Sequence, residues 1–157
     1  MYTIHAHITI DASLEQVFET ITDHEQFLSS PGMTCRMVTE GTVHTQGQGA
    51  VREVTADGSA FTEEITAFDP PHHYEYIVRN LVGAGGKQVP LRHERGWLDF
   101  RAEGDATRID WYSRFAVSIP IAGWFMERVL GRRAASGFQR WLEQTKAKLE
   151  MSPSPAG

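Results

Sequence analysis

The longest regular pattern in the chain is a run from Ile119 to Leu149 whose large side chains recur at helical spacing. Ser118 is a suitable N-cap, and Pro120 is tolerated in a first helical turn because its missing N–H is not needed there. Gly131 and Gly137 interrupt the run and indicate either a kink or a close approach by another group. A helix of roughly 30 residues is about 45 Å long. It needs a large apolar partner, and that partner should be a sheet, because nearly everything before it is predicted as β-strand.

The remainder of the chain alternates between short extended segments and turns. A strand is predicted at residues 2–10, followed by a helix capped by Asp11 or Ser13 that runs through Ile21, and by a second short helical piece at 22–27. Six further strands are predicted at residues 33–45, 50–55, 59–68, 72–80, 91–102 and 106–117. Strands joined in this order form an antiparallel meander, and the last helix is the only element long enough to cover its apolar face. We therefore expect an α+β domain over residues 1–150, with a ligand cavity between a curved sheet and the helix, and a disordered tail at 151–157.

Composition and charge narrow the classes of function. The formal net charge of −5 argues against nucleic-acid binding, which usually needs a basic stripe. The single Cys35 excludes an internal disulfide and any multi-cysteine metal site, and it fits a reducing cytoplasm. The longest apolar run, residues 115–126, is shorter than the roughly 20 residues of a membrane span, and the first residues do not resemble a signal peptide. We expect a cytoplasmic protein without integral membrane association, which binds a hydrophobic or amphipathic small molecule in the cavity between sheet and helix.

Three local patterns resemble a known superfamily. The first is the opening strand and helix ITIDASLEQVFETITD, residues 8–23, and the second is EEITAFDPPHHYEYIV, residues 63–78, with an Asp-Pro-Pro corner between two strands. The third is the hairpin GWLDF…ATRIDWYSRF that leads into the long helix. With the order of elements, they resemble the START-like (SRPBCC) helix-grip superfamily in its polyketide cyclase/dehydrase-type branch, over the chain before the tail. The resemblance implies a helix-grip fold whose members bind lipids, hormones and polyketides; a few catalyse cyclisation or hydrolysis, and some act as chaperone partners.

The candidate ligand-binding residues follow from strict alternation along the strands. If the sheet curls around the helix, one face of each strand turns toward it, and a one-residue slip would reverse that face. The apolar and aromatic candidates are Phe61, Ile65, Tyr74, Tyr76, Leu98, Phe100, Trp111 and Phe115. Trp124, at the start of the helix, is expected to flank the cavity together with Trp111. A bulge inside any strand would reverse part of this assignment.

Polar residues on the same strand faces are the candidates for chemistry. Glu63, Arg92 and Glu94 share faces with the apolar candidates. A carboxylate in an apolar cleft needs a partner such as Arg92 or Ser113. Burial raises the pKa of a carboxyl group toward the range that a general acid–base uses near neutral pH. Glu63 is therefore the candidate catalytic residue, and Tyr76 is a candidate hydrogen-bond donor to a substrate carbonyl.

The sequence leaves three classes of function open. The chain contains no nucleophile, metal or cofactor motif, which favours a non-enzymatic carrier or binding protein over a cyclase, aromatase or dehydratase. A chaperone-activator-like interaction module is a weaker alternative. We expect no cofactor and no metal site: His5 and His7 share a strand face, but the sequence offers no third ligand for them. The glycine-rich segment 81–90 is predicted to be a mobile loop at the mouth of the cavity.

Overall fold

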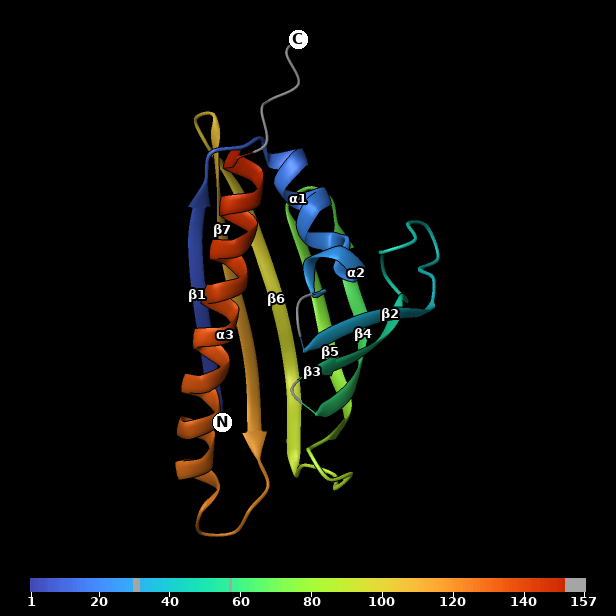
Figure 1. The fold of residues 1–157 in the computed structure, drawn as a ribbon, viewed down its shortest axis with the longest axis vertical. Coiled ribbons are helices and arrows are strands. Elements are labelled where there is room, and N and C mark those ends of the chain that lie inside the picture. Colours follow the sequence, from blue (N-terminus) through green and yellow to red (C-terminus); the bar gives the residue numbers. More distant parts are fainter. Residues whose placement is uncertain (30–31, 57, 152–157) are drawn as a thin grey trace.

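The computed structural model describes residues 1–29, 32–56 and 58–151 (Figure 1). The predicted disordered tail therefore lies outside the described residues, except for Met151, which ends the last helix. The connections expected between the predicted elements at 22–27 and 33–45 and at 50–55 and 59–68 lie partly outside them, at residues 30–31 and 57.

The order of elements is strand, two short helices, six strands and one long helix, as predicted. The elements are β1 (Tyr2–Ile10), α1 (Leu14–Thr22), α2 (His24–Phe27), β2 (Met33–Thr39), β3 (Val51–Ala56), β4 (Ser59–Asp69), β5 (His73–Val82), β6 (Leu91–Glu103), β7 (Ala106–Val117) and α3 (Gly123–Met151).

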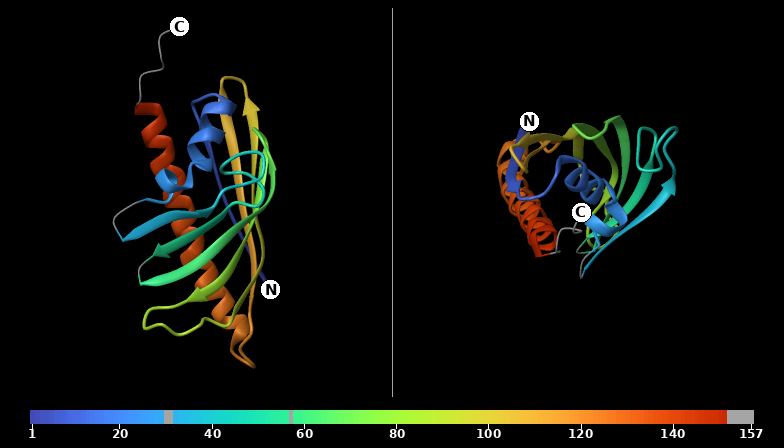
Figure 2. Two further views of the ribbon diagram at one scale, coloured as in Figure 1. Left: turned by 90° about the vertical axis from the view of Figure 1, so that its right-hand side faces the viewer. Right: turned by 90° about the horizontal axis from the view of Figure 1, so that it is seen from above.

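The strands form one seven-stranded antiparallel sheet in the order β1-β7-β6-β5-β4-β3-β2. Strands β2 to β7 each pair with their neighbours in sequence, whereas β1 crosses over to pair with β7, with Tyr2 opposite Phe115 and Ile10 opposite Thr107. The sheet is curved, and α3 runs along its concave side, packed mainly against β1 and β7 (Figures 1 and 2). The predicted α+β helix-grip architecture is confirmed. Of the described helices, none combines the length and the apolar character that crossing a membrane requires.

Helix α1 fills one end of the concave side. The Ser13 hydroxyl caps the helix by accepting a hydrogen bond from the Gln16 N–H at 3.3 Å. Its apolar stripe, with Val17 and Ile21 fully buried, faces the sheet. The Phe18 ring meets the Phe100 ring edge-on, with 5.0 Å between the ring centroids. Packed apolar side chains therefore fill the concave side at this end of the sheet and form part of the hydrophobic core.

Helix α3 begins at Gly123, and the prediction of a helix capped by Ser118 was wrong. Residues 119–122 form a turn in which Ile121 adopts a left-handed conformation, with φ of +66°. A Cβ atom at Gly123 would lie 2.7 Å from the Val117 carbonyl oxygen. The helix therefore starts where a glycine allows the chain to pass close to the end of β7.

The two helical glycines have different roles. A Cβ atom at Gly131 would lie 2.2 Å from Cε1 of the Tyr2 ring, so Gly131 permits the close approach of α3 to β1. A Cβ atom at Gly137 would meet nothing within 4 Å, because this residue borders a cavity.

Strand β2 is shorter than predicted. A register shift between Met37 and Thr39 disturbs its pairing with β3, and the strand ends at Thr39 instead of Thr45. The chain then folds back on itself, with the Gly41 N–H donating to the Thr45 carbonyl oxygen at 3.0 Å. The alternation seen in sequence at residues 40–45 thus belongs to a turn-rich loop.

Candidate functional site

An apolar cavity of about 480 Å³ lies between the concave side of the sheet and α3. This volume falls within the range of roughly 300–1,000 Å³ that small-molecule sites in proteins occupy. Strands β1, β5, β6 and β7 form one wall, α3 forms the opposite wall, and α2 with strands β2 to β4 forms the side. The apolar lining residues are Ile4, Phe27, Leu28, Met33, Val54, Ala56, Phe61, Val78, Leu81, Val89, Leu91, Trp111, Phe115, Leu130, Ala134, Phe138 and Trp141.

Stacked aromatic rings form the middle of this lining. The Trp111 ring of β7 lies parallel to the Phe138 ring of α3, with 3.9 Å between centroids, and Trp141 is stacked 5.9 Å from Trp111. The Phe27 ring of α2 also lies 5.9 Å from the Trp111 ring, and its plane is tilted by 46° relative to that ring. These rings give the cavity a flat, polarisable surface that suits an apolar or aromatic molecule.

A buried ion pair borders the cavity on the side of β3 and β4. Arg52 is fully buried and donates from Nη1 to Oε1 of Glu63 at 3.0 Å, and from Nη2 to the Gln46 carbonyl oxygen at 3.3 Å. Burial raises the pKa of the Glu63 carboxyl, and the Arg52 charge offsets part of that rise. Oε2 of Glu63 has no hydrogen-bond partner among the described residues, and Glu63 lines the cavity.

His24 completes the polar group around this ion pair. Its Nδ1 lies 2.7 Å from the Thr22 carbonyl oxygen, which can only accept, so Nδ1 carries a hydrogen. Nε2 of the neutral ring then accepts from the Tyr74 hydroxyl at 3.1 Å. Burial, followed by the nearby Arg52 charge, holds the pKa of His24 well below its usual value. His24 is therefore a neutral ring at neutral pH that keeps the Tyr74 hydroxyl hydrogen occupied.

A second polar network lies on the β5–β6–β7 side of the cavity. The Val78 N–H donates to His93 Nδ1 at 3.0 Å, so the ring hydrogen is on Nε2, which donates to Ser113 Oγ at 3.0 Å. Trp111 Nε1–H donates to the Tyr76 hydroxyl at 2.9 Å, and the Ser113 hydroxyl lies near that of Tyr76. Burial lowers the pKa of His93 to about 4 and raises the pKa of Tyr76. All of these groups are neutral at neutral pH.

A glycine on β6 makes the second network possible. Gly96 is directly opposite Tyr76 in the sheet, and a Cβ atom at Gly96 would lie 2.2 Å from Cζ of the Tyr76 ring. The tyrosine ring therefore lies across the strand at this position, and the His93 ring stacks on it with 5.5 Å between centroids. Any other residue at position 96 would displace the Tyr76 hydroxyl.

The structure brings many of the predicted site residues to the cavity. Those that line it are Phe61, Glu63, Tyr74, Tyr76, Trp111, Ser113 and Phe115. Their roles in binding or catalysis stay predictions. The expected lining position of Ile65, Leu98 and Phe100 was wrong: these residues are buried in the core cluster that contains Phe18 of α1. Helix α1 occupies the space in front of that part of the sheet.

The expected placement of Arg92, Glu94 and Trp124 at the cavity was also wrong. A β-bulge between residues 93 and 95 reverses the alternation of β6, so His93 faces the cavity while Glu94 is exposed, 4.0 Å from Arg114. Arg92 precedes the bulge and is exposed as well. Trp124 lies in the first turn of α3, and its side chain is 62% exposed.

Sequence reasoning missed four polar residues at or beside the cavity. Arg52 alternates with Ala50 and Val54 on a strand, and that pattern alone would have placed it on the buried face. His93 was hidden by the bulge. His24 lies in a helix too short for a periodicity, and Arg133 lies on α3 at the rim of the cavity.

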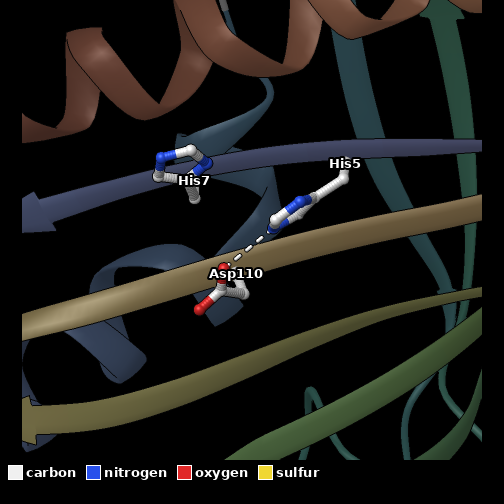
Figure 3. A group of neighbouring side chains, drawn as sticks. All are labelled: His5, His7 and Asp110. Carbon is white, nitrogen blue, oxygen red and sulfur yellow. Dashed lines mark hydrogen bonds and ion pairs between the residues drawn. The ribbon is translucent and has the colours of Figure 1, made fainter.

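On the opposite, outer face of the sheet, His5 and His7 meet a third possible ligand (Figure 3). Asp110 of β7 supplies a carboxylate oxygen, and the three ligand atoms lie within 4.8 Å of one another, which the sequence did not predict. Asp110 Oδ1 is 2.8 Å from His5 Nε2, but Arg108 donates to both oxygens at 2.9 and 3.0 Å, and Arg101 donates to Oδ2 at 3.3 Å. The hydrogen bonds from Arg108 are the main reason for the lowered pKa of Asp110. Because two guanidinium groups already neutralise the carboxylate, an ion-pair network explains this cluster.

The glycine-rich segment between β5 and β6 borders the cavity, as predicted. Leu81, Val89 and Leu91 contribute to the lining, and the Val89 N–H donates to the Leu81 carbonyl oxygen at 2.9 Å. Gly85 and Gly86 have φ of +92° and +76°, which favours glycine at both positions. The mobility of the loop stays a prediction.

Comparisons with known proteins agree with this architecture. The model of the family described as "Polyketide cyclase / dehydrase and lipid transport" matches residues 1–150. No curated protein sequence matches the chain. The fold is similar to that of the protein TTHA0849 from Thermus thermophilus, with a TM-score of 0.73 and 17% identity over 98% of this chain and 100% of that one.

Two further solved structures share the fold at similarly low identity. Ara h 8.0201 aligns with a TM-score of 0.67 and 19% identity, over 94% of this chain and 98% of that one. DynU16, a protein of the dynemicin biosynthetic locus, aligns with a TM-score of 0.63 and 14% identity, over 95% of this chain and 47% of that one. Identities at this level establish a shared fold and nothing finer.

Proposed function

Because this chain belongs to the polyketide cyclase/dehydrase and lipid transport family, within the START-like superfamily, we propose that it binds a hydrophobic small molecule between the sheet and α3. The observation that carries the proposal is the apolar cavity of about 480 Å³, walled by stacked aromatic rings. The proposed role is that of a cytoplasmic carrier or binding protein that holds its ligand without changing it.

The polar network around Tyr76 indicates what else the ligand should contain. Two hydrogen bonds end on hydroxyl oxygens of this network: Trp111 donates to Tyr76, and His93 donates to Ser113. Each hydroxyl still carries its own hydrogen, and at most one of the two can be donated to the other hydroxyl, so at least one hydrogen has no acceptor inside the network. Both hydroxyls line the cavity. A ligand with a carbonyl or similar acceptor at this point would satisfy that hydrogen.

A ligand acceptor at this point would remove an energetic cost in the protein and would add affinity for the ligand. A buried hydroxyl hydrogen without an acceptor is unfavourable by about 1–3 kcal/mol, and forming a hydrogen bond gives a net stabilisation of about 0.5–1.5 kcal/mol. The apolar lining supplies affinity for any hydrophobic molecule, whereas the Tyr76–Ser113 pair supplies a preference for one with a correctly placed acceptor. The proposed ligand is therefore largely apolar with at least one uncharged acceptor oxygen.

The first experiment tests whether the cavity binds. Gly137→Phe places a ring in the cavity, since a Cβ atom at this position meets nothing within 4 Å. Ser136→Phe adds the same bulk to an exposed position on the same helix and is the matched control. The probe is 2-acetylnaphthalene, measured by titration calorimetry. We expect binding to the wild-type protein and to Ser136→Phe, and loss of at least about tenfold in affinity for Gly137→Phe. Equal affinity in all three proteins contradicts the proposal.

The second experiment tests the acceptor. 2-Ethylnaphthalene has nearly the shape of 2-acetylnaphthalene and lacks the carbonyl group. The double variant Tyr76→Phe/Ser113→Ala should reduce the affinity ratio of the ketone to the hydrocarbon by about 2- to 10-fold, the worth of one hydrogen bond. An unchanged ratio would remove the two hydroxyls from the site.

An enzyme of the cyclase, aromatase or dehydratase kind is the second candidate function, and Glu63 is the observation in its favour. Its pKa is raised by burial, and its Oε2 lacks a hydrogen-bond partner among the described residues. The Arg52 ion pair argues for the carrier, because it offsets part of the rise in the Glu63 pKa and holds the carboxylate in place. Mass spectrometry of the molecule that co-purifies with the protein, before and after prolonged incubation, separates the two. A mass change that Glu63→Gln abolishes would establish the enzyme.

A further inference from the structure

Residues 119–133 comprise the turn that follows β7 and the first turns of α3, and we call this segment the α3 tip. It exposes a group of large apolar side chains. Its exposed apolar members are Ile119, Ile121, Trp124, Phe125 and Val129. Ile121 is 96% exposed and Trp124 is 62% exposed. Isolated apolar side chains are ordinary on a protein surface, but a contiguous group that includes a tryptophan and a phenylalanine marks a surface that contacts something.

The backbone of the tip forms a closed turn with an unusual conformation at Ile121. Ile121 has φ of +66°, a region that β-branched residues rarely adopt. The turn is closed by hydrogen bonds from the Ala122 N–H to the Pro120 carbonyl oxygen at 2.7 Å and from the Gly123 N–H to the Ile119 carbonyl oxygen at 2.9 Å. The Ile121 side chain is exposed, so it buries no apolar surface that would offset this strain, which points to a functional contact.

Three arginines accompany the apolar group. Arg128, Arg132 and Arg133 are exposed on α3, and the described residues provide none of them with an ion-pair partner. The Arg128 guanidinium lies 5.4 Å from the centre of the Trp124 ring, within the range of a cation–π interaction. At least one cationic group therefore lies directly against the exposed apolar side chains of the tip.

The acidic residue of the tip is turned away from this surface. Glu127 is buried and accepts hydrogen bonds from the Val117 N–H at 3.0 Å and from the amino group of Met1 at 2.8 Å. The sequence contains no other acidic residue between 119 and 133. The exposed surface of the tip is thus positively charged on a chain whose formal net charge is −5.

We propose that the α3 tip docks on the surface of an anionic lipid bilayer. Exposed tryptophan, phenylalanine and isoleucine side chains enter the boundary between headgroups and acyl chains, and the arginines bind lipid phosphates. Charge complementarity sets the orientation, because the rest of the chain is net acidic and is repelled by the same surface. A two-fold contact with a second copy is less favourable, since it would place the unpaired arginines of both copies near one another.

The tip also lies at the rim of the cavity. Leu130 and Arg133 line the cavity from α3, and the Ser118 N–H donates to the Pro90 carbonyl oxygen at 2.8 Å, which joins the tip to the loop between β5 and β6. Both segments lie at the end of the molecule away from α1 (Figures 1 and 2). A docked tip therefore brings the cavity rim to the bilayer. The docking itself does not depend on the ligand proposed above.

Vesicle co-sedimentation tests the proposal with the full chain. The probes are vesicles of phosphatidylcholine alone and equimolar phosphatidylcholine and phosphatidylglycerol, each at low and high salt. We expect binding to the anionic vesicles that weakens with salt, and about a tenfold or greater loss for Trp124→Ser/Phe125→Ser. Arg128→Gln/Arg132→Gln should lower the affinity for anionic vesicles about fivefold per arginine and should change the binding to neutral vesicles little.

Two matched controls change equivalent groups elsewhere. Val43→Ser removes a side chain that is 85% exposed in the loop between β2 and β3, and Arg140→Gln removes an exposed charge farther along α3. Both should bind anionic vesicles as the wild-type protein does, and so should the cavity-filling variant Gly137→Phe. Wild-type protein that stays in the supernatant with anionic vesicles overturns the proposal, as does equal binding by the tip variants. A concentration-dependent dimer in analytical ultracentrifugation that Trp124→Ser/Phe125→Ser abolishes, without vesicle binding, would assign the tip to self-association.

Discussion

Replacing His93 by glutamine should remove a large part of the acid sensitivity of this protein. Glutamine can still accept from the Val78 N–H and donate to Ser113, but it does not titrate in this range. The wild-type ring resists protonation, because a second hydrogen on Nδ1 would face the Val78 N–H inside the protein. Burial accordingly lowers the pKa of His93 from 6.5 to about 4.

The sign and size of the effect follow from proton linkage. The unfolded chain takes up a proton at His93 near pH 6.5, whereas the folded chain does so only near pH 4. Stability from this group is therefore complete above pH 6.5 and is lost as the pH falls toward 4. Two and a half pH units at about 1.36 kcal/mol each amount to roughly 3 kcal/mol. His24, whose pKa is also lowered, adds to the loss, while Glu63, whose pKa is raised, opposes it.

Urea unfolding followed by tryptophan fluorescence, at several values between pH 7.5 and pH 4.5, measures this directly. The wild-type free energy of unfolding should fall with pH more steeply than that of His93→Gln, by up to about one proton, or about 1.36 kcal/mol per pH unit. His72→Gln changes an exposed histidine and is the matched control. Parallel pH profiles for wild type and His93→Gln would refute the assigned hydrogen-bond pattern around His93.

Three further predictions concern the buried ion pair, the two helical glycines and the cysteine. Glu63→Gln leaves Arg52 as an uncompensated buried charge and should lower the free energy of unfolding by about 3–5 kcal/mol, whereas Arg52→Met/Glu63→Leu should recover most of it in urea unfolding. Gly137→Ala should raise the thermal midpoint, by about 0.5–1 kcal/mol in stability, while Gly131→Ala should lower it by about 1–3 kcal/mol, because its Cβ atom would meet the tyrosine ring of β1. Burial raises the pKa of Cys35 from 9.0 to about 12, so iodoacetamide at pH 8 should alkylate the folded protein about a thousandfold more slowly than the urea-unfolded chain.

Each of these has an outcome that contradicts it. A double variant no more stable than Glu63→Gln alone would show that the ion pair is not the source of the loss. Equal shifts for the two glycine variants would contradict the close contact at Gly131. Alkylation of Cys35 at the same rate in folded and unfolded protein would mean that the thiol is accessible in the native state.

The sequence by itself determined the architecture of this protein. Alternation at residues 2–10 and 106–117 and the helical period after Gly123 are local patterns, so they identify β1, β7 and α3 without knowledge of their neighbours. Because an apolar sheet face and a long amphipathic helix must cover each other, the helix-grip arrangement follows from those patterns. The same alternation placed Tyr74, Tyr76 and Trp111 on the concave side, and the structure has them there.

Only the tertiary structure decided which residues meet at the cavity. Because of the bulge in β6, His93 faces the cavity where the sequence predicted Glu94. Nothing local in the sequence marks this bulge, because a bulge depends on the pairing with β7. Helix α1 packed over Phe100, so a residue on the correct face ended in solid core. Burial then set the charge of His24 and His93, and hydrogen bonds with the backbone of Thr22 and Val78 set their tautomers. Alternation reports the face of a strand, but what stands in front of that face depends on elements far away in the chain, which is why the candidate site needed the fold.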